Sequence, residues 1–251
     1  MKDKGQLTHD EPEIPTILPV IKAVAPFVLQ TEPKPLEIDL QRTAVIVIDM
    51  QHTFVSKGGK FDLRGEDVAK TQTIIEPIKR ITSTARTKGM RIIHVAHHHS
   101  PDFHDSGGPD SPNWRKSTIT DYRERPELRD KLCFSDRWGA DIIDELKPQQ
   151  GDIFVPKPRY SAFFGTRLDM ILKTYGIKYL ICVGVATNIC VEGTIRDAFN
   201  LDYFSILISD ATMNSGPSFM QEAALRNIKS CFGWVTNTEN IMKAIEAKET
   251  G

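Results

Sequence analysis

The sequence lacks an uninterrupted apolar run of about 20 residues, the length that a membrane-spanning helix needs. One apolar stretch near the start, residues 17–29, has the hydrophobicity of a signal segment. However, Pro19, Lys22 and Pro26 interrupt it and acidic residues precede it. The chain also lacks an excess of basic charge, because 32 Lys and Arg are balanced by 33 Asp and Glu. We therefore expect a cytoplasmic protein with no membrane and no nucleic-acid partner.

Cysteine is scarce, and its spacing excludes the usual paired arrangements. The four cysteines, at positions 133, 182, 190 and 231, form no CxxC pair and no zinc-like pattern, which suits a reducing compartment. No G-x-G-x-x-G or Walker sequence is present, so nucleotide chemistry is disfavoured. The G-x-S-x-G elbow of serine hydrolases is absent as well.

A regular alternation of short apolar runs and helical segments is present from residue 43 onward. Strands are predicted at residues 43–48, 91–96, 152–156, 179–185, 203–209 and 232–236. Helices are predicted at residues 67–88 (kinked or starting late because of Pro77), 138–146, 166–175, 191–200, 217–228 and 239–247. Strands that alternate with helices indicate the α/β class. We expect a doubly wound, six-stranded, mainly parallel sheet with helices on both faces.

The first 40 residues differ in composition from the rest of the chain. They contain six prolines without a clear period, which is typical of an extended arm with polyproline character. The pattern leaves open whether this arm is disordered, covers its own domain or reaches a neighbouring subunit. We therefore divide the chain into a Pro-rich N-terminal arm, residues 1–40, and one α/β domain, residues 41–251.

Three predicted strands end on side chains that can take part in catalysis. Asp49 follows the first strand, Lys157 follows the third, and Cys190 follows the fourth at the start of a helix. The carboxyl ends of parallel strands meet at one edge of the sheet, so an acid, a cation and a thiol are expected together there. A helix N-terminus favours an anion, so we expect a lowered pKa for Cys190. Taken singly, each residue has a simpler structural explanation. Asp49 could be a turn residue or a helix cap, Lys157 a solvated charge and Cys190 a buried apolar group.

Together the three suit nucleophilic acyl transfer, in which the acid takes the thiol proton and the cation holds the pair charged. The segments 48–51 (IDMQ), 157–158 (KP) and 184–190 (GVATNIC) resemble the signature of the isochorismatase-like cysteine hydrolases. The resemblance extends over residues 43–245. Within that family the segments 107–113, 156–161 and 231–235 are most similar to the ureidoacrylate-cleaving branch.

The resemblance implies a role for each matching residue. Asp49 would be the general base, Lys157 the catalytic lysine and Cys190 the nucleophile, with the backbone N–H groups of Ala186 and Cys190 as the oxyanion hole. It also implies a cis peptide bond between Val185 and Ala186. The implied substrate-binding residues are Phe54, His97, His99, Asn113 and Tyr160.

The implied activity is that of a cofactor-free amidohydrolase acting on a small linear ureido or carbamoyl compound, in a homodimer or homotetramer. His97 and His99 depart from the ureidoacrylate pattern, so the recognised acid group is open; biuret, triuret, N-carbamoylsarcosine, maleamate and nicotinamide remain alternative substrates. His97, His99 and His104 suggest a metal-dependent alternative, although three ligands with the family's spacing are not reproduced. We expect no metal. A binding protein with an idle site is the non-enzymatic alternative.

Overall fold

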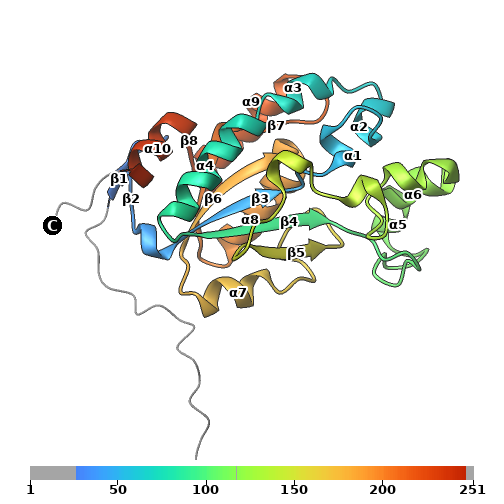
Figure 1. The fold of residues 1–251 in the computed structure, drawn as a ribbon, viewed down its shortest axis with the longest axis horizontal. Helices are drawn as coiled ribbons and strands as arrows, with labels where there is room; N and C mark the ends of the chain where they lie inside the picture. Colours follow the sequence, from blue (N-terminus) through green and yellow to red (C-terminus); the bar gives the residue numbers. More distant parts are fainter. Residues whose placement is uncertain (1–26, 117, 247–251) are drawn as a thin grey trace, which may run out of the picture.

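The structure, a computed structural model, describes residues 27–116 and 118–246 (Figure 1). The strands are β1 Phe27–Leu29, β2 Leu36–Ile38, β3 Thr43–Ile48, β4 Arg91–His97, β5 Ile153–Lys157, β6 Tyr179–Val185, β7 Phe204–Met213 and β8 Trp234–Thr236. The α-helices are α1 His52–Val55, α2 Lys60–Leu63, α3 Val68–Gln72, α4 Ile75–Thr87, α5 Pro112–Lys116, α6 Thr118–Glu124, α7 Leu168–Thr174, α8 Glu192–Asn200, α9 Phe219–Asn227 and α10 Thr238–Glu246.

Six strands form one parallel sheet in the order β5-β4-β3-β6-β7-β8. The chain first adds β4 and β5 on one side of β3, then crosses to add β6, β7 and β8 on the other. The connections from β3 and β6 therefore leave in opposite directions. This reversal opens a crevice at the carboxyl ends of the two strands, which is where ligands bind in open α/β sheets. The predicted doubly wound α/β fold is confirmed.

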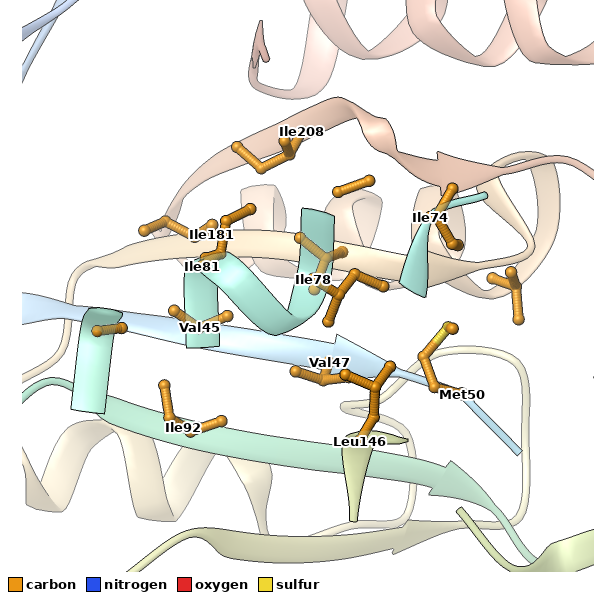
Figure 2. Close-up of a cluster of buried hydrophobic side chains, with 14 of the residues drawn as sticks. Val45, Val47, Met50, Ile74, Ile78, Ile81, Ile92, Leu146, Ile181 and Ile208 are labelled. Carbon is orange, nitrogen blue, oxygen red and sulfur yellow. The ribbon is translucent and has the colours of Figure 1, made fainter. Parts of the chain in front are cut away.

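Alternate residues of the central strands enter two separate hydrophobic cores. Val45 and Val47 of β3 face the core covered by α4 and α10, and Figure 2 shows them packed beneath Ile78 and Ile81. Ile46 and its neighbours two residues away face the opposite core, which α7 and α8 cover. A strand buried on both faces is apolar throughout, and all six residues of β3 are buried.

Gly184 allows the ends of β3 and β6 to approach each other closely. Its φ is +112°, and a Cβ atom at this position would lie 2.0 Å from the carbonyl oxygen of Ile48. Only glycine tolerates both conditions. The close approach brings the residues that follow the two strands to one place at the sheet edge.

Two of the predicted helices differ from the structure. The predicted helix 67–88 is divided into α3 and α4, and Pro77 lies in the first turn of α4, where a missing N–H costs no hydrogen bond. The prediction of a helix at residues 138–146 is wrong. The chain there forms two short 3-10 turns, Trp138–Ala140 and Asp144–Leu146, which bury Ile142, Ile143 and Leu146.

Residues 27–40, the described part of the Pro-rich segment, pack over their own domain. β1 and β2 form an antiparallel pair, and Glu32 exchanges two backbone hydrogen bonds with Val235 at the sheet edge, 2.8 and 3.0 Å long. Leu29 and Ile38 are fully buried in the α4 core. Residues 1–26 of the predicted arm lie outside the described residues. None of the helices within residues 27–116 and 118–246 has the length and apolarity to cross a membrane.

Candidate active site

Asp49 leaves the end of β3 in a conformation that aims its side chain into the sheet-edge crevice. Its φ is +53°, in the left-handed region that few residues other than glycine adopt and that Asp tolerates better than most. Its backbone N–H donates to the Val95 carbonyl at 2.8 Å, which fixes this turn to β4. Backbone strain of this kind persists where the surrounding structure enforces it. The Asp49 side chain is fully buried as a result.

Lys157 is the last residue of β5 and neutralises Asp49. The Lys157 Nζ lies 2.9 Å from Asp49 Oδ2, and neither side chain is exposed. The same ammonium donates to the Arg159 carbonyl at 3.0 Å. Asp49 Oδ1 has no hydrogen-bond partner among the described residues. A buried carboxylate with a free oxygen beside a paired one can still accept a proton from a neighbouring group.

Cys190 lies in a π-helical turn, Thr187–Val191, between β6 and α8. Its Sγ lies within 4.8 Å of both the nearest Asp49 oxygen and the nearest His97 nitrogen. The preceding peptide bond between Val185 and Ala186 is cis, as the resemblance implies. The structure therefore brings Asp49, Lys157 and Cys190 together from three different strands.

Burial raises the pKa of the Cys190 thiol, and the Asp49 charge raises this pKa further, while Lys157 opposes both. This direction is opposite to the lowered pKa expected from the sequence. The helix N-terminus does not prevail because the sulfur is 5% exposed, and removal from water disfavours the thiolate. Burial also opposes the charge of Lys157, but Asp49 and Cys190 outweigh it and raise the pKa of that lysine. The thiol is therefore neutral at rest, beside the Lys157–Asp49 ion pair.

A buried histidine pair adjoins this group. The Nε2 atoms of His97 and His99 are 3.1 Å apart, so one ring donates and the other accepts. His99 Nδ1 lies 3.7 Å from Asp105 Oδ1. Burial opposes ionisation of Asp105, but contacts with His99 and Ser100 lower its pKa to about 2. Burial, with Lys157 and His99 adding to it, lowers the pKa of His97 well below 6.5. His97 is therefore a neutral ring facing the site.

A small cavity of about 80 Å³, which opens to solvent, lies over the thiol. Its lining residues are Asp49, Phe54, Lys60, Phe61, Arg64, His97, Lys116, Thr118, Tyr160, Ala186, Ile189, Cys190 and Ser215. Of the residues predicted to bind substrate, Phe54, His97 and Tyr160 lie in this lining, and so does Ala186, whose N–H was predicted for the oxyanion hole.

The structure does not place two predicted substrate-binding residues in this lining. His99 is fully buried behind His97, because its ring packs against His97 and Phe134. Asn113 Nδ2 donates to the Ser106 carbonyl, and its backbone N–H donates to Ser111 Oγ.

The cationic part of the lining, Lys60, Arg64 and Lys116, was not evident from the sequence. Lys60 begins the short helix α2 and Arg64 follows its end. Isolated basic residues of this kind resemble ordinary surface charges in sequence, so no pattern marks them as part of a binding site. Lys116 ends α5 within the long connection after β4, and the length of such a connection is a recognised sign of function.

The histidine set considered as a metal site is not assembled. His104 is exposed and binds Asp102 at 2.7 Å, away from the His97–His99 pair. Within residues 27–116 and 118–246, the three side chains of metal-ligating type whose ligand atoms cluster are Asp49, His97 and Cys190. Of these three, Asp49 already forms an ion pair with Lys157, and Cys190 lies beside that pair.

The doubly wound fold, with a thiol, a carboxylate and an ammonium at its switch point, is an arrangement suited to a hydrolase with a cysteine nucleophile. The Isochorismatase domain family matches residues 43–240, and the chain belongs to this family. The chain is 44% identical to a protein named ureidoacrylate amidohydrolase RutB from Serratia proteamaculans, over 91% of this chain and 95% of that protein. It is 46% identical to the protein of that name from Klebsiella pneumoniae, over 86% of this chain and 92% of that protein.

Among solved structures, a cysteine hydrolase from Pseudomonas syringae matches with a TM-score of 0.70 and 27% identity. The match covers 87% of this chain and 97% of that one. The resemblance to the isochorismatase-like hydrolases is thus confirmed. The chain is an amidohydrolase of this family.

Proposed function

We propose that this chain hydrolyses a C–N bond of a small linear ureido or carbamoyl compound of the ureidoacrylate type. Cys190 would be the nucleophile, Asp49 the general base and Lys157 the group that keeps Asp49 ionised. The observation that carries the proposal is the convergence of Asp49 and Cys190 on the buried end of one cavity, with Lys157 paired to Asp49. Two relatives similar over almost their whole length bear the ureidoacrylate amidohydrolase name, which supports this substrate type.

The reaction would begin with transfer of the thiol proton from Cys190 to Asp49 as the sulfur attacks the ureido carbonyl. Because the pKa of the thiol is raised, the thiolate forms during attack and is not stored beforehand. The backbone N–H groups of Ala186 and Cys190 would stabilise the oxyanion. Lys157 would stabilise the negative charge that the sulfur and the carboxylate share.

Collapse of this intermediate would break the C–N bond, with Asp49 returning the proton to the leaving nitrogen. The product left on the enzyme is a thioester at Cys190. Asp49 would then remove a proton from an attacking water, the C–S bond would break as that proton returns to the sulfur, and the released carbamate would decompose to ammonia and CO2. No cofactor enters these steps, and we expect the enzyme to act as a homodimer or homotetramer.

The test is ammonia release from a panel of substrates: ureidoacrylate, biuret, triuret, N-carbamoylsarcosine, maleamate and nicotinamide. We expect the highest kcat/KM with ureidoacrylate and no loss of activity after treatment with a chelator. A panel ranked in favour of nicotinamide, with activity lost on chelation and restored by a metal, would support the metal-dependent alternative instead. No turnover of any member would favour a binding protein.

A further inference from the structure

The cavity changes character between its two ends. At the inner end, Cys190 is 5% exposed and Asp49 is fully buried. At the mouth, Arg64 and Lys116 are exposed, and Lys60 is buried just inside them. A ligand with its reacting carbonyl at Cys190 would therefore extend toward three cationic side chains.

The cationic groups are not fully neutralised by their protein neighbours. Asp121, which is 6% exposed, contacts both the Lys60 ammonium at 2.8 Å and the Arg64 guanidinium. Among the described lining residues, Asp49 is the one carboxylate, and it is already paired with Lys157. The mouth of the cavity thus holds three cations; Asp121 contacts two of them, and the nearby carboxylate of Glu66 accepts a hydrogen bond from the lining residue Ser215.

Hydrogen-bond donors remain available at this end. The Lys60 ammonium has three N–H donors; it contacts Asp121 and donates to Thr118 Oγ1 at 3.3 Å. The Arg64 guanidinium has five donors, and its contact with Asp121 uses one terminal nitrogen. A guanidinium can donate two parallel hydrogen bonds to one carboxylate, so Arg64 suits a carboxylate ligand.

The local backbone holds these side chains in place before a ligand arrives. Gly59 precedes Lys60, and a Cβ there would lie 2.2 Å from the His52 carbonyl oxygen, so this entry to α2 requires glycine. Asp121 of α6 then ties Lys60 and Arg64 to a second helix. Groups positioned beforehand lose less conformational entropy when they bind.

Tyr160 connects the two ends of the cavity. Burial raises the pKa of its hydroxyl, Cys190 raises it further, and Arg64 lowers it. Tyr160, Cys190 and Arg64 all line this one cavity, so the nucleophile and the guanidinium face the same space.

We propose that Lys60, Arg64 and Lys116 form an anion-binding site that selects substrates carrying a carboxylate at the end remote from the scissile carbonyl. This inference builds on the proposed function, because it assigns the far end of the same substrate. Arg64 and Lys116 are specificity-determining residues, and Asp121 positions Lys60 and Arg64.

The test measures binding and not turnover, with 3-ureidopropionate and its neutral amide as probes and the full-length Cys190→Ser protein as the parent. Isothermal titration calorimetry should show the acid binding at least about tenfold more tightly than the amide. Arg64→Gln and Lys116→Gln, each added to the parent, should weaken acid binding by about tenfold and leave amide binding unchanged. Higher salt should reduce the preference, because the mouth is open to solvent.

Lys243→Gln provides the matched control, since it removes one positive charge from an exposed part of α10. It should leave both affinities unchanged. Equal binding of acid and amide by the parent, no measurable binding of the acid, or unaltered binding in both cavity variants would overturn the proposal. Absence of ureido turnover with an intact preference for the acid would reject the reaction and retain the anion site.

Discussion

At the scale of single residues, the site depends on a buried ion pair. Lys157 and Asp49 are both fully buried and 2.9 Å apart. Loss of one partner leaves an uncompensated charge in the interior, whereas loss of both leaves none. Stability and catalysis should therefore respond differently to single and double substitution.

We expect Asp49→Asn to lower the free energy of unfolding by about 3–5 kcal/mol, because Lys157 loses its counter-charge. Activity should fall by about 10²–10⁴-fold, the usual contribution of a general base. The double variant Asp49→Asn/Lys157→Met should recover much of the stability without recovering activity. Urea unfolding and ammonia release measure the two effects. A single variant as stable as the unmodified chain would contradict the ion-pair account.

The three residues of this group could be predicted from the sequence because each lies at the end of a predicted strand or shortly after it. The sequence did not identify the direction of the Cys190 pKa shift. That direction depends on how far the sulfur is removed from water, which is a property of the whole sheet edge. Lys60 and Arg64 were missed for a related reason, since their position at the cavity depends on a contact with Asp121, 57 or more residues away.

At the scale of elements, the six strands were predictable because residues buried on both faces form continuous apolar runs. The prediction of a helix at 138–146 was wrong because the apolar residues there are spaced partly as in a helix. They are buried instead by short turns packed against the sheet. The close approach of β3 to β6 at Gly184 was not evident from sequence, since it depends on the pairing register of two distant strands.

Gly184→Ala should severely destabilise the protein, because a Cβ would overlap the Ile48 carbonyl oxygen at a φ that only glycine adopts readily. Gly193→Ala in α8 is the matched control. Its added Cβ would meet nothing closer than 3.9 Å, and alanine in a helix is favoured by roughly 0.5–1 kcal/mol. Thermal unfolding distinguishes them. A Gly184→Ala protein as stable as the Gly193→Ala protein would show that the two strands do not approach as described.

At the scale of the whole molecule, buried histidines link stability to pH. Burial lowers the pKa of His97 well below 6.5, and burial lowers the pKa values of His52, His94 and His98 in the same direction. Below pH 6.5 the unfolded chain takes up protons that the folded chain does not. The stability of the fold should therefore decrease as the pH falls through this value.

His97→Asn should make the unfolding temperature less dependent on pH between pH 7.5 and 5.5, since it removes one such group. His104→Asn is the control with the opposite sign. Asp102 raises the pKa of His104, so this residue favours the folded state below pH 6.5, and its loss should not flatten the profile. Thermal scans at several pH values test both variants. An unchanged pH profile in His97→Asn would contradict the assignment of a neutral buried ring.

The most direct test of the account is ammonia release from ureidoacrylate by the unmodified chain, Cys190→Ala and Cys231→Ala. Cys231 is exposed and outside the cavity lining, so its variant controls for loss of a cysteine in general. The account predicts turnover by the unmodified chain, background rates for Cys190→Ala and unchanged rates for Cys231→Ala. Substantial turnover by a folded Cys190→Ala protein would contradict it.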